Sequence, residues 1–177
     1  MQDRYAGDVG DFGKYSLLHQ VFNESNGVVR LGVNWYYVTR QENGNGDGNH
    51  IDYLSKTNKG WAQYRECFPL LYDKLKSIVS HGRKISEIEN RGVLPDQTIF
   101  YSKPIPYFSA TSSKRIKDRE KWFEESLSRL SEADIIFLDP DNGIQLDTSS
   151  KGTPNAVKYA FTDEIERYFK LGKSLII

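Results

Sequence analysis

Apolar positions along the chain follow two different periods, one typical of helices and one typical of buried strands. Apolar residues recur at helical spacing in four segments, at residues 14–25, 68–82, 114–130 and 161–173. Runs rich in β-branched and aromatic residues occupy four others, at 28–38, 97–105, 133–140 and 174–177. This alternation predicts an α/β fold with a Rossmann-like, mainly parallel sheet and helices on both faces.

The segment 83–95, "RKISEIENRGVLP", fits two elements equally well, a short strand followed by a turn or a second helix. Other boundaries carry clearer signals. Pro69 suits the first turn of a helix and Gly82 is placed to end it. Thr162 is expected to be the N-cap of the last helix, because acidic residues follow it in the first turn.

We predict a single domain over residues 1–177, with an inserted subregion at 55–82 that leaves the α/β core. The chain contains no internal repeat and no linker that would separate two domains. The last apolar run begins only at Ser174. A domain rarely ends on a newly started strand, so we expect the fold to be truncated at its C-terminus.

Composition narrows the partners and the location. The chain has 24 Lys and Arg and 24 Asp and Glu, so contact with RNA or DNA would need a local basic patch. A single Cys excludes an internal disulfide framework, and scattered His residues give no metal-ligand spacing. We expect no metal site and no membrane association, because no apolar run approaches the length of a span. The N-terminal residues lack the apolar region of a secretory signal, which favours a cytoplasmic protein.

The best basic patch lies on the helix predicted at 114–130. Its residues are Lys114, Arg115, Lys117, Arg119 and Lys121. One interpretation is a solvated helix face, because acidic residues are interspersed. The other is contact with nucleic-acid phosphates.

Polar loops follow two of the predicted strands. Residues 39–50, "TRQENGNGDGNH", are rich in glycine, and "DPDNG" at 139–143 follows the clearest strand of the chain. In open parallel sheets, ligands bind beyond the carboxyl ends of the strands where the strand order reverses. We therefore expect a ligand site that both loops line.

One interpretation of "IIFLDPDNG" is that Asp139 and Asp141 form a catalytic pair of carboxylates. It resembles the strand and Asp-x-Asp motif of haloacid-dehalogenase-like phosphatases. That resemblance implies a metal-dependent phosphohydrolase, with Asp139 as nucleophile and Asp141 as acid/base. It is the alternative that we retain, although the motif normally opens its domain.

A second resemblance covers more of the chain. "YAGDVGDFGKYSLL" resembles the N-terminal motif of bacterial ribosomal-RNA methyltransferases that modify the adenine amino group. The matching positions are Ala6, Gly7, Asp11 and Lys14. "IIFLDPDNG" is similar to the strand of that family that ends in Asp-Pro-Pro-Tyr, and the order of elements agrees. The resemblance implies a Rossmann-type enzyme that uses S-adenosylmethionine to methylate an amine, such as that of a nucleic acid base.

The same resemblance assigns the site. It implies that Asp139 and Pro140 accept hydrogen bonds from the target amine, while Asp141 and Asn142 replace the second proline and the aromatic residue. For the cofactor it implies contacts from Lys14, Tyr15, Asn34, Trp35, Tyr36 and Asp47. A carboxylate for the ribose would come from Glu87 or Glu89 if their segment is a strand. A third interpretation is a non-catalytic relic of the fold that binds nucleotides or nucleic acid, because the aromatic residue is missing.

Overall fold

The computed structural model describes residues 1–39 and 48–177, which form two compact units. The first, which we call the sheet unit, holds Met1, Val28–Thr39 and Gln97–Ile177. The second, the helical unit, holds Gln2–Gly27 and Arg40–Asp96. The insertion predicted at 55–82 falls within the helical unit.

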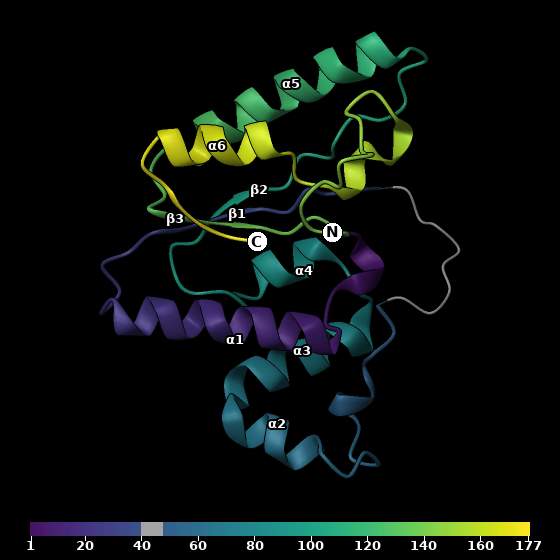
Figure 1. The fold of residues 1–177 in the computed structure, drawn as a ribbon. Coiled ribbons are helices and arrows are strands. Elements are labelled where there is room, and N and C mark those ends of the chain that lie inside the picture. The colour runs from purple at the N-terminus through teal and green to yellow at the C-terminus, as the bar shows by residue number, and fades with distance from the viewer. Residues whose placement is uncertain (40–47) are drawn as a thin grey trace. The chain divides into compact units, whose positions relative to one another are not determined.

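The sheet unit contains a four-stranded sheet in which every neighbouring pair is parallel (Figure 1). Its strands are β1 (Leu31–Asn34), β2 (Ile99–Tyr101), β3 (Ile135–Leu138) and β4 (Ser174–Ile176). Their order is β2-β1-β3-β4. This confirms the predicted α/β class with a parallel, Rossmann-like sheet.

Two helices, α5 (Ser112–Arg129) and α6 (Thr162–Lys170), pack against the same face of the sheet (Figure 1). A short 3₁₀ helix, η3 (Pro154–Lys158), precedes α6. Trp122 and Phe123 of α5 are buried against Ile136 and Leu138 of β3 in one apolar core. The helical spacing of apolar residues in α5 therefore marked the face that is buried.

The strand order reverses between β1 and β3. From β1 the chain continues to β2, which pairs with one edge of β1, and it then returns to β3, which pairs with the opposite edge of β1. β1 and β3 are in register, with Asn34 opposite Leu138. The N–H of Asp139 donates to the carbonyl of Asn34 at 3.0 Å, so the pairing extends one residue past the strand end. The switch point therefore carries the residues after Asn34 and after Leu138.

The helical unit consists of α1 (Val9–Glu24), α2 (Trp61–Cys67), α3 (Pro69–His81) and α4 (Ile85–Asn90), with 3₁₀ turns η1 (Asp3–Tyr5) and η2 (Asp52–Leu54). Aromatic rings hold it together: the ring of Tyr53 lies 5.7 Å from Phe12, 5.2 Å from Tyr64 and 6.1 Å from Tyr72. Such tilted and edge-to-face contacts contribute beyond the area that the rings bury. The segment 83–95 contains the helix α4 at Ile85–Asn90, so of its two interpretations the helix is correct.

Several predicted boundaries were wrong, including the strand predicted over 97–105, which covers only Ile99–Tyr101. The first helix begins earlier than residue 14, because the carboxylate of Asp8 accepts the N–H of Asp11 and caps the helix at Val9. The strand predicted over 28–38 ends at Asn34. Phe161 rather than Thr162 is the N-cap of α6, and the Glu164 carboxylate accepts the Phe161 N–H at 3.1 Å. Among the described residues, no helix is long and apolar enough to cross a membrane.

Candidate functional site

The candidate site lies in the sheet unit, at the carboxyl ends of β1 and β3. The predicted catalytic residues Asp139–Asn142 follow β3, and Asn34–Tyr36 end β1. The parallel register of the two strands brings these segments together at the switch point.

An ammonium group occupies the centre of this site. The α-nitrogen of Met1 lies 2.9 Å from the carbonyl oxygen of Asp139 and 3.2 Å from that of Tyr36. The Oδ1 atom of Asp141 forms an ion pair with the same nitrogen at 2.8 Å. Met1 is 2% exposed and the Asp141 side chain 3%, so this charged contact is buried. Sequence reasoning missed Met1, because no pattern in the chain marks it as a partner of "DPDNG".

Tyr36 has an unusual backbone conformation that directs its carbonyl group into the site. Its φ is 46°, in the left-handed region that costs a bulky residue on the order of 1–2 kcal/mol. The side-chain oxygen of Asn34 accepts the Tyr36 N–H at 3.1 Å. The Asn34 amide in turn donates to the hydroxyl of Tyr168 at 3.2 Å. Hydrogen bonds thus hold the strained residue in place from the strand that precedes it.

The phenol of Tyr36 is held as firmly as its backbone. It donates to Oε2 of Glu164 at 3.1 Å. The guanidinium of Arg119 donates two hydrogen bonds to the same carboxylate, from Nε to Oε1 at 2.6 Å and from a terminal nitrogen to Oε2 at 2.9 Å. Burial, reinforced by the charge of Glu164, raises the pKa of Tyr36 well above its ordinary value. Tyr36 therefore stays a neutral donor to Glu164.

Arg119 cannot contact nucleic acid, so that part of the predicted basic patch was wrong. It is 2% exposed, and besides Glu164 it donates to the carbonyl oxygens of Ala156 and Tyr159 at 2.8 and 2.7 Å. The ring of Phe161 lies 4.6 Å from its guanidinium carbon. The sequence showed Arg119 only as one of several basic residues on a predicted helix. It did not show that the Arg119 side chain is buried in the core.

The other basic residues of the patch differ in exposure. Lys114 is exposed and pairs with Asp118 at 2.9 Å. Arg115 is half-buried and donates to the carbonyl oxygens of Gly152 and Ser109, both at 2.6 Å. Lys117 is exposed on α5. Contact with phosphates through Lys114 and Lys117 stays a prediction.

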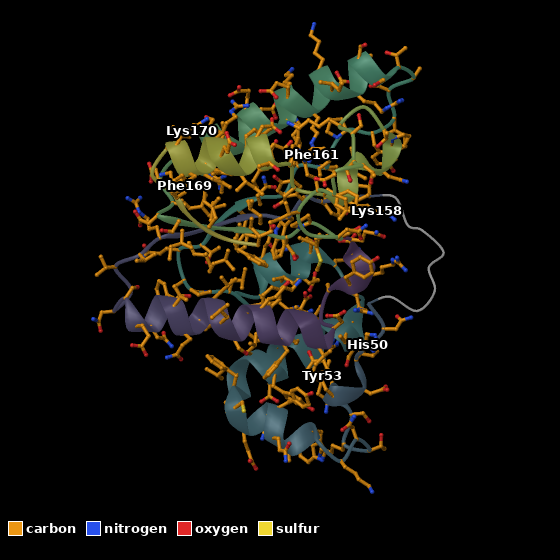
Figure 2. The ribbon with its side chains drawn as sticks, viewed as in Figure 1. His50, Tyr53, Lys158, Phe161, Phe169 and Lys170 are labelled. Atoms are coloured by element: carbon orange, nitrogen blue, oxygen red, sulfur yellow. The ribbon has the colours of Figure 1, made fainter. Side chains whose placement is uncertain are left out.

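Asn142 is bound to the segment before α6 rather than to the ammonium group. Its N–H donates to the carbonyl of Lys158 at 2.8 Å, and its side-chain amide donates to the hydroxyl of Tyr159 at 3.1 Å. The segment before α6 runs from Lys158 to Phe161, and both of these residues are labelled in Figure 2. The second half of "DPDNG" therefore fixes the loop, and Asp139 and Asp141 form the part that holds the ammonium.

The side chains that end β1 are buried. Trp35 stacks on Phe100, with ring centroids 6.1 Å apart and planes inclined by 6°. Asn34 is fully buried and bonded to Tyr36 and Tyr168. A cofactor contact from this segment would therefore come from the backbone, as the carbonyl of Tyr36 illustrates.

The remaining predicted cofactor residues belong to the helical unit. Lys14 pairs with Asp11 at 2.9 Å, and Asp11 also accepts the N–H of Gly7 at 2.9 Å. Tyr15 is fully buried in α1. The motif "GDVGDFGK" thus builds the start of a helix. Whether Lys14 and Tyr15 bind a cofactor stays a prediction.

Glu87 and Glu89 lie on helix α4, not at the end of a strand. Glu87 binds Arg91 at 2.6 Å, one helical turn away. Assignment of a ribose ligand to these residues depended on a strand, so the structure removes its basis. Asp47, with the glycine-rich stretch 40–47, lies outside the described residues.

The site is a set of oxygen atoms that converge on one nitrogen. Within residues 1–39 and 48–177, no group of three His, Cys, Asp or Glu side chains is arranged to hold a metal ion. No family model, curated protein or solved structure matches this chain.

Proposed function

We propose that the sheet unit is the core of an S-adenosylmethionine-dependent methyltransferase that acts on an amine. The observation that carries the proposal is the buried ammonium of Met1 at the switch point, held by two carbonyl oxygens and the Asp141 carboxylate. The end of a parallel strand pair where the order reverses is where such sheets bind their ligands.

The residues present fit this cofactor. S-adenosylmethionine carries a methionine α-ammonium, and under the proposal this group would displace Met1 and take over the contacts that the Met1 α-ammonium makes here. Under the proposal, the carbonyls of Tyr36 and Asp139 would accept its N–H groups, and Asp141 would neutralise its charge. When bound, S-adenosylmethionine supplies an electrophilic methyl group.

The resemblance assigns the target amine to Asp139 and Pro140. An amine must be neutral to present its lone pair, and acceptors that take its N–H groups fix the direction of that lone pair. Asp139 is 7% exposed and Pro140 is half-buried, directly after β3. A carboxylate in this setting can orient the amine and accept a proton as the new bond forms.

Calorimetric titration with S-adenosylmethionine tests cofactor binding. We expect saturable heat with the wild-type protein and binding at least tenfold weaker for Asp141→Asn, because a charge-assisted contact is lost. Asp147→Asn is the matched control, since Asp147 is an exposed acid of the following loop. Absence of heat at millimolar cofactor would remove the proposal.

Methyl transfer is measured with methyl-tritiated S-adenosylmethionine and separate pools of RNA, DNA and small amines. We expect label in one pool and its loss in Asp139→Ala. Binding without transfer to any pool would favour the non-catalytic relic. Magnesium-dependent release of phosphate from p-nitrophenyl phosphate would favour the phosphohydrolase.

A further inference from the structure

We infer that the buried Arg119–Glu164 ion pair is a positioning element of the site, acting through Tyr36. The pair fixes the tyrosine whose carbonyl oxygen receives the ammonium. Its importance for catalysis rests on the proposed function, whereas the coupling itself does not. Neither residue touches the ammonium, so both are distinct from the oxygen atoms that hold it.

Tyr36 needs external support because its conformation is unfavourable by itself. With φ at 46°, the residue would relax to an extended or helical conformation if its contacts were lost. Relaxation would rotate the peptide that follows and turn the carbonyl oxygen away from Met1. Asn34 restrains the N–H of Tyr36, and Glu164 restrains the phenol.

Glu164 is held in place from three sides. Its carboxylate receives two bonds from Arg119, one from Tyr36 and one from the N–H of Phe161 at the start of α6. The ammonium of Lys151 lies 3.6 Å from it and adds a second positive charge. A carboxylate bound in this way cannot move without breaking several charge-assisted bonds, so the Tyr36 phenol has a rigid acceptor.

Stability alone does not account for placing this pair in the core. Glu164 is 1% exposed and Arg119 2%, and the cost of removing both charges from water offsets most of their attraction. Replacing a buried ion pair by apolar residues of similar volume is often neutral or stabilising. Unlike apolar residues, the ion pair offers a fixed hydrogen-bond acceptor to the Tyr36 hydroxyl. This bond holds Tyr36 beside the candidate site.

Tyr36→Phe isolates the link, because it removes one hydroxyl and leaves the ion pair in place. Tyr101→Phe is the matched control: Tyr101 lies in the same core and its hydroxyl donates to the carbonyl of Trp122 at 2.7 Å. The readout is the rate at which an acylating N-hydroxysuccinimide ester labels the Met1 α-amine, followed by mass spectrometry of the N-terminal peptide.

We expect Tyr36→Phe to be labelled about tenfold faster than Tyr101→Phe, the effect of one lost buried hydrogen bond on the local opening equilibrium. Both variants lose a buried hydroxyl bond, so urea unfolding should show similar losses of stability. A purely structural role would raise labelling equally in the two variants. Equal labelling rates at equal stability would overturn the inference.

Titration with S-adenosylmethionine separates this inference from the proposed function. Faster labelling of Tyr36→Phe together with no cofactor binding by the wild type would remove the function and keep the coupling. Wild-type binding with unchanged affinity and unchanged labelling in Tyr36→Phe would remove the coupling and keep the function. If both hold, cofactor affinity falls several-fold in Tyr36→Phe and stays unchanged in Tyr101→Phe.

Discussion

The α-ammonium of Met1 lies 2.8 Å from Oδ1 of Asp141, and both groups are almost fully buried. Buried charges of opposite sign depend on one another, because either alone would carry the full cost of leaving water. This pair stands at the switch point of a parallel sheet, where the carbonyls of Tyr36 and Asp139 complete it. The buried ammonium therefore depends on the Asp141 carboxylate for its counter-charge.

Asp141→Asn should loosen the site without unfolding the protein. The amide keeps the shape and still offers an oxygen, but the ammonium loses its counter-charge, which costs about 1.5–3 kcal/mol. We expect a lower free energy of unfolding in urea and faster acylation of the Met1 amine. Asp147→Asn, which changes an exposed acid, should match the wild type in both. Equal behaviour of the two variants would show that the ion pair contributes nothing.

Arg119→Met should be among the most destabilising single changes in the sheet unit. The change removes the main counter-charge of the buried Glu164 carboxylate and leaves Lys151, at 3.6 Å, as its nearest remaining cation. It also leaves the carbonyl oxygens of Ala156 and Tyr159 without the hydrogen bonds that Arg119 donates. Breaking a buried pair by removing one partner costs about 3–5 kcal/mol. The measurement is the urea midpoint, with Lys117→Met, an exposed position of the same helix, as the control. A loss no larger than that of the control would show that the pair is not coupled to the core.

The sequence predicted the parts of the site that depend on local pattern. An apolar run that ends in charged residues marked β3 and Asp139, and alternation of elements predicted the parallel sheet. The ion pairs could not be predicted in this way, because their partners are far apart in the chain. Met1 meets Asp141 across 140 positions, and Glu164 meets Arg119 across 45. Only the strand order and the packing of α5 and α6 determine which residues meet.

Local signals also failed where tertiary contacts decided the outcome. Tyr36 lies in a run that predicts a strand, yet its contacts hold it in a left-handed conformation that ends β1 early. Arg119 belongs to a charged stretch that predicts a solvated face, yet its partner Glu164 draws it into the core. Glu164 itself looked like an ordinary acid of a first helical turn. These three residues support the site. Local sequence preferences predicted a different conformation for Tyr36 and gave no sign that Arg119 and Glu164 are buried.

Gly32→Ala should destabilise the centre of the sheet. A Cβ atom at this position of β1 would lie 2.8 Å from the Cβ of Ala133 and 3.3 Å from a methyl group of Leu130. Overpacking of this kind costs about 1–3 kcal/mol. Gly13→Ala is the contrasting change, because a Cβ in that turn of α1 meets nothing within 4 Å and alanine favours helices by about 1 kcal/mol. Thermal melts should therefore shift in opposite directions, and a shift of the same sign for both would contradict the packing at β1.

Alkaline pH should unfold the protein through its buried tyrosines. Burial raises the pKa of Tyr168 to about 12, and it also raises the pKa of Tyr36, Tyr53 and Tyr101 above the ordinary value. Above about pH 10 the unfolded chain releases these protons while the folded protein keeps them. Folding stability is thus intact below about pH 10 and falls as pH rises toward 12, by about 1.4 kcal/mol per pH unit for each such tyrosine.

The measurement compares tyrosinate absorbance with far-ultraviolet circular dichroism during one alkaline titration. Exposed tyrosines should ionise first without loss of structure, because their protons are equally available in both states. The buried group should then ionise in the same step in which the dichroism signal collapses, since its protons leave only on unfolding. Tyr168→Phe removes one of these protons and should make stability fall less steeply with pH, even if the lost hydroxyl bonds lower its starting value. Complete ionisation of all tyrosines with native dichroism would show that the buried hydroxyls are accessible to solvent.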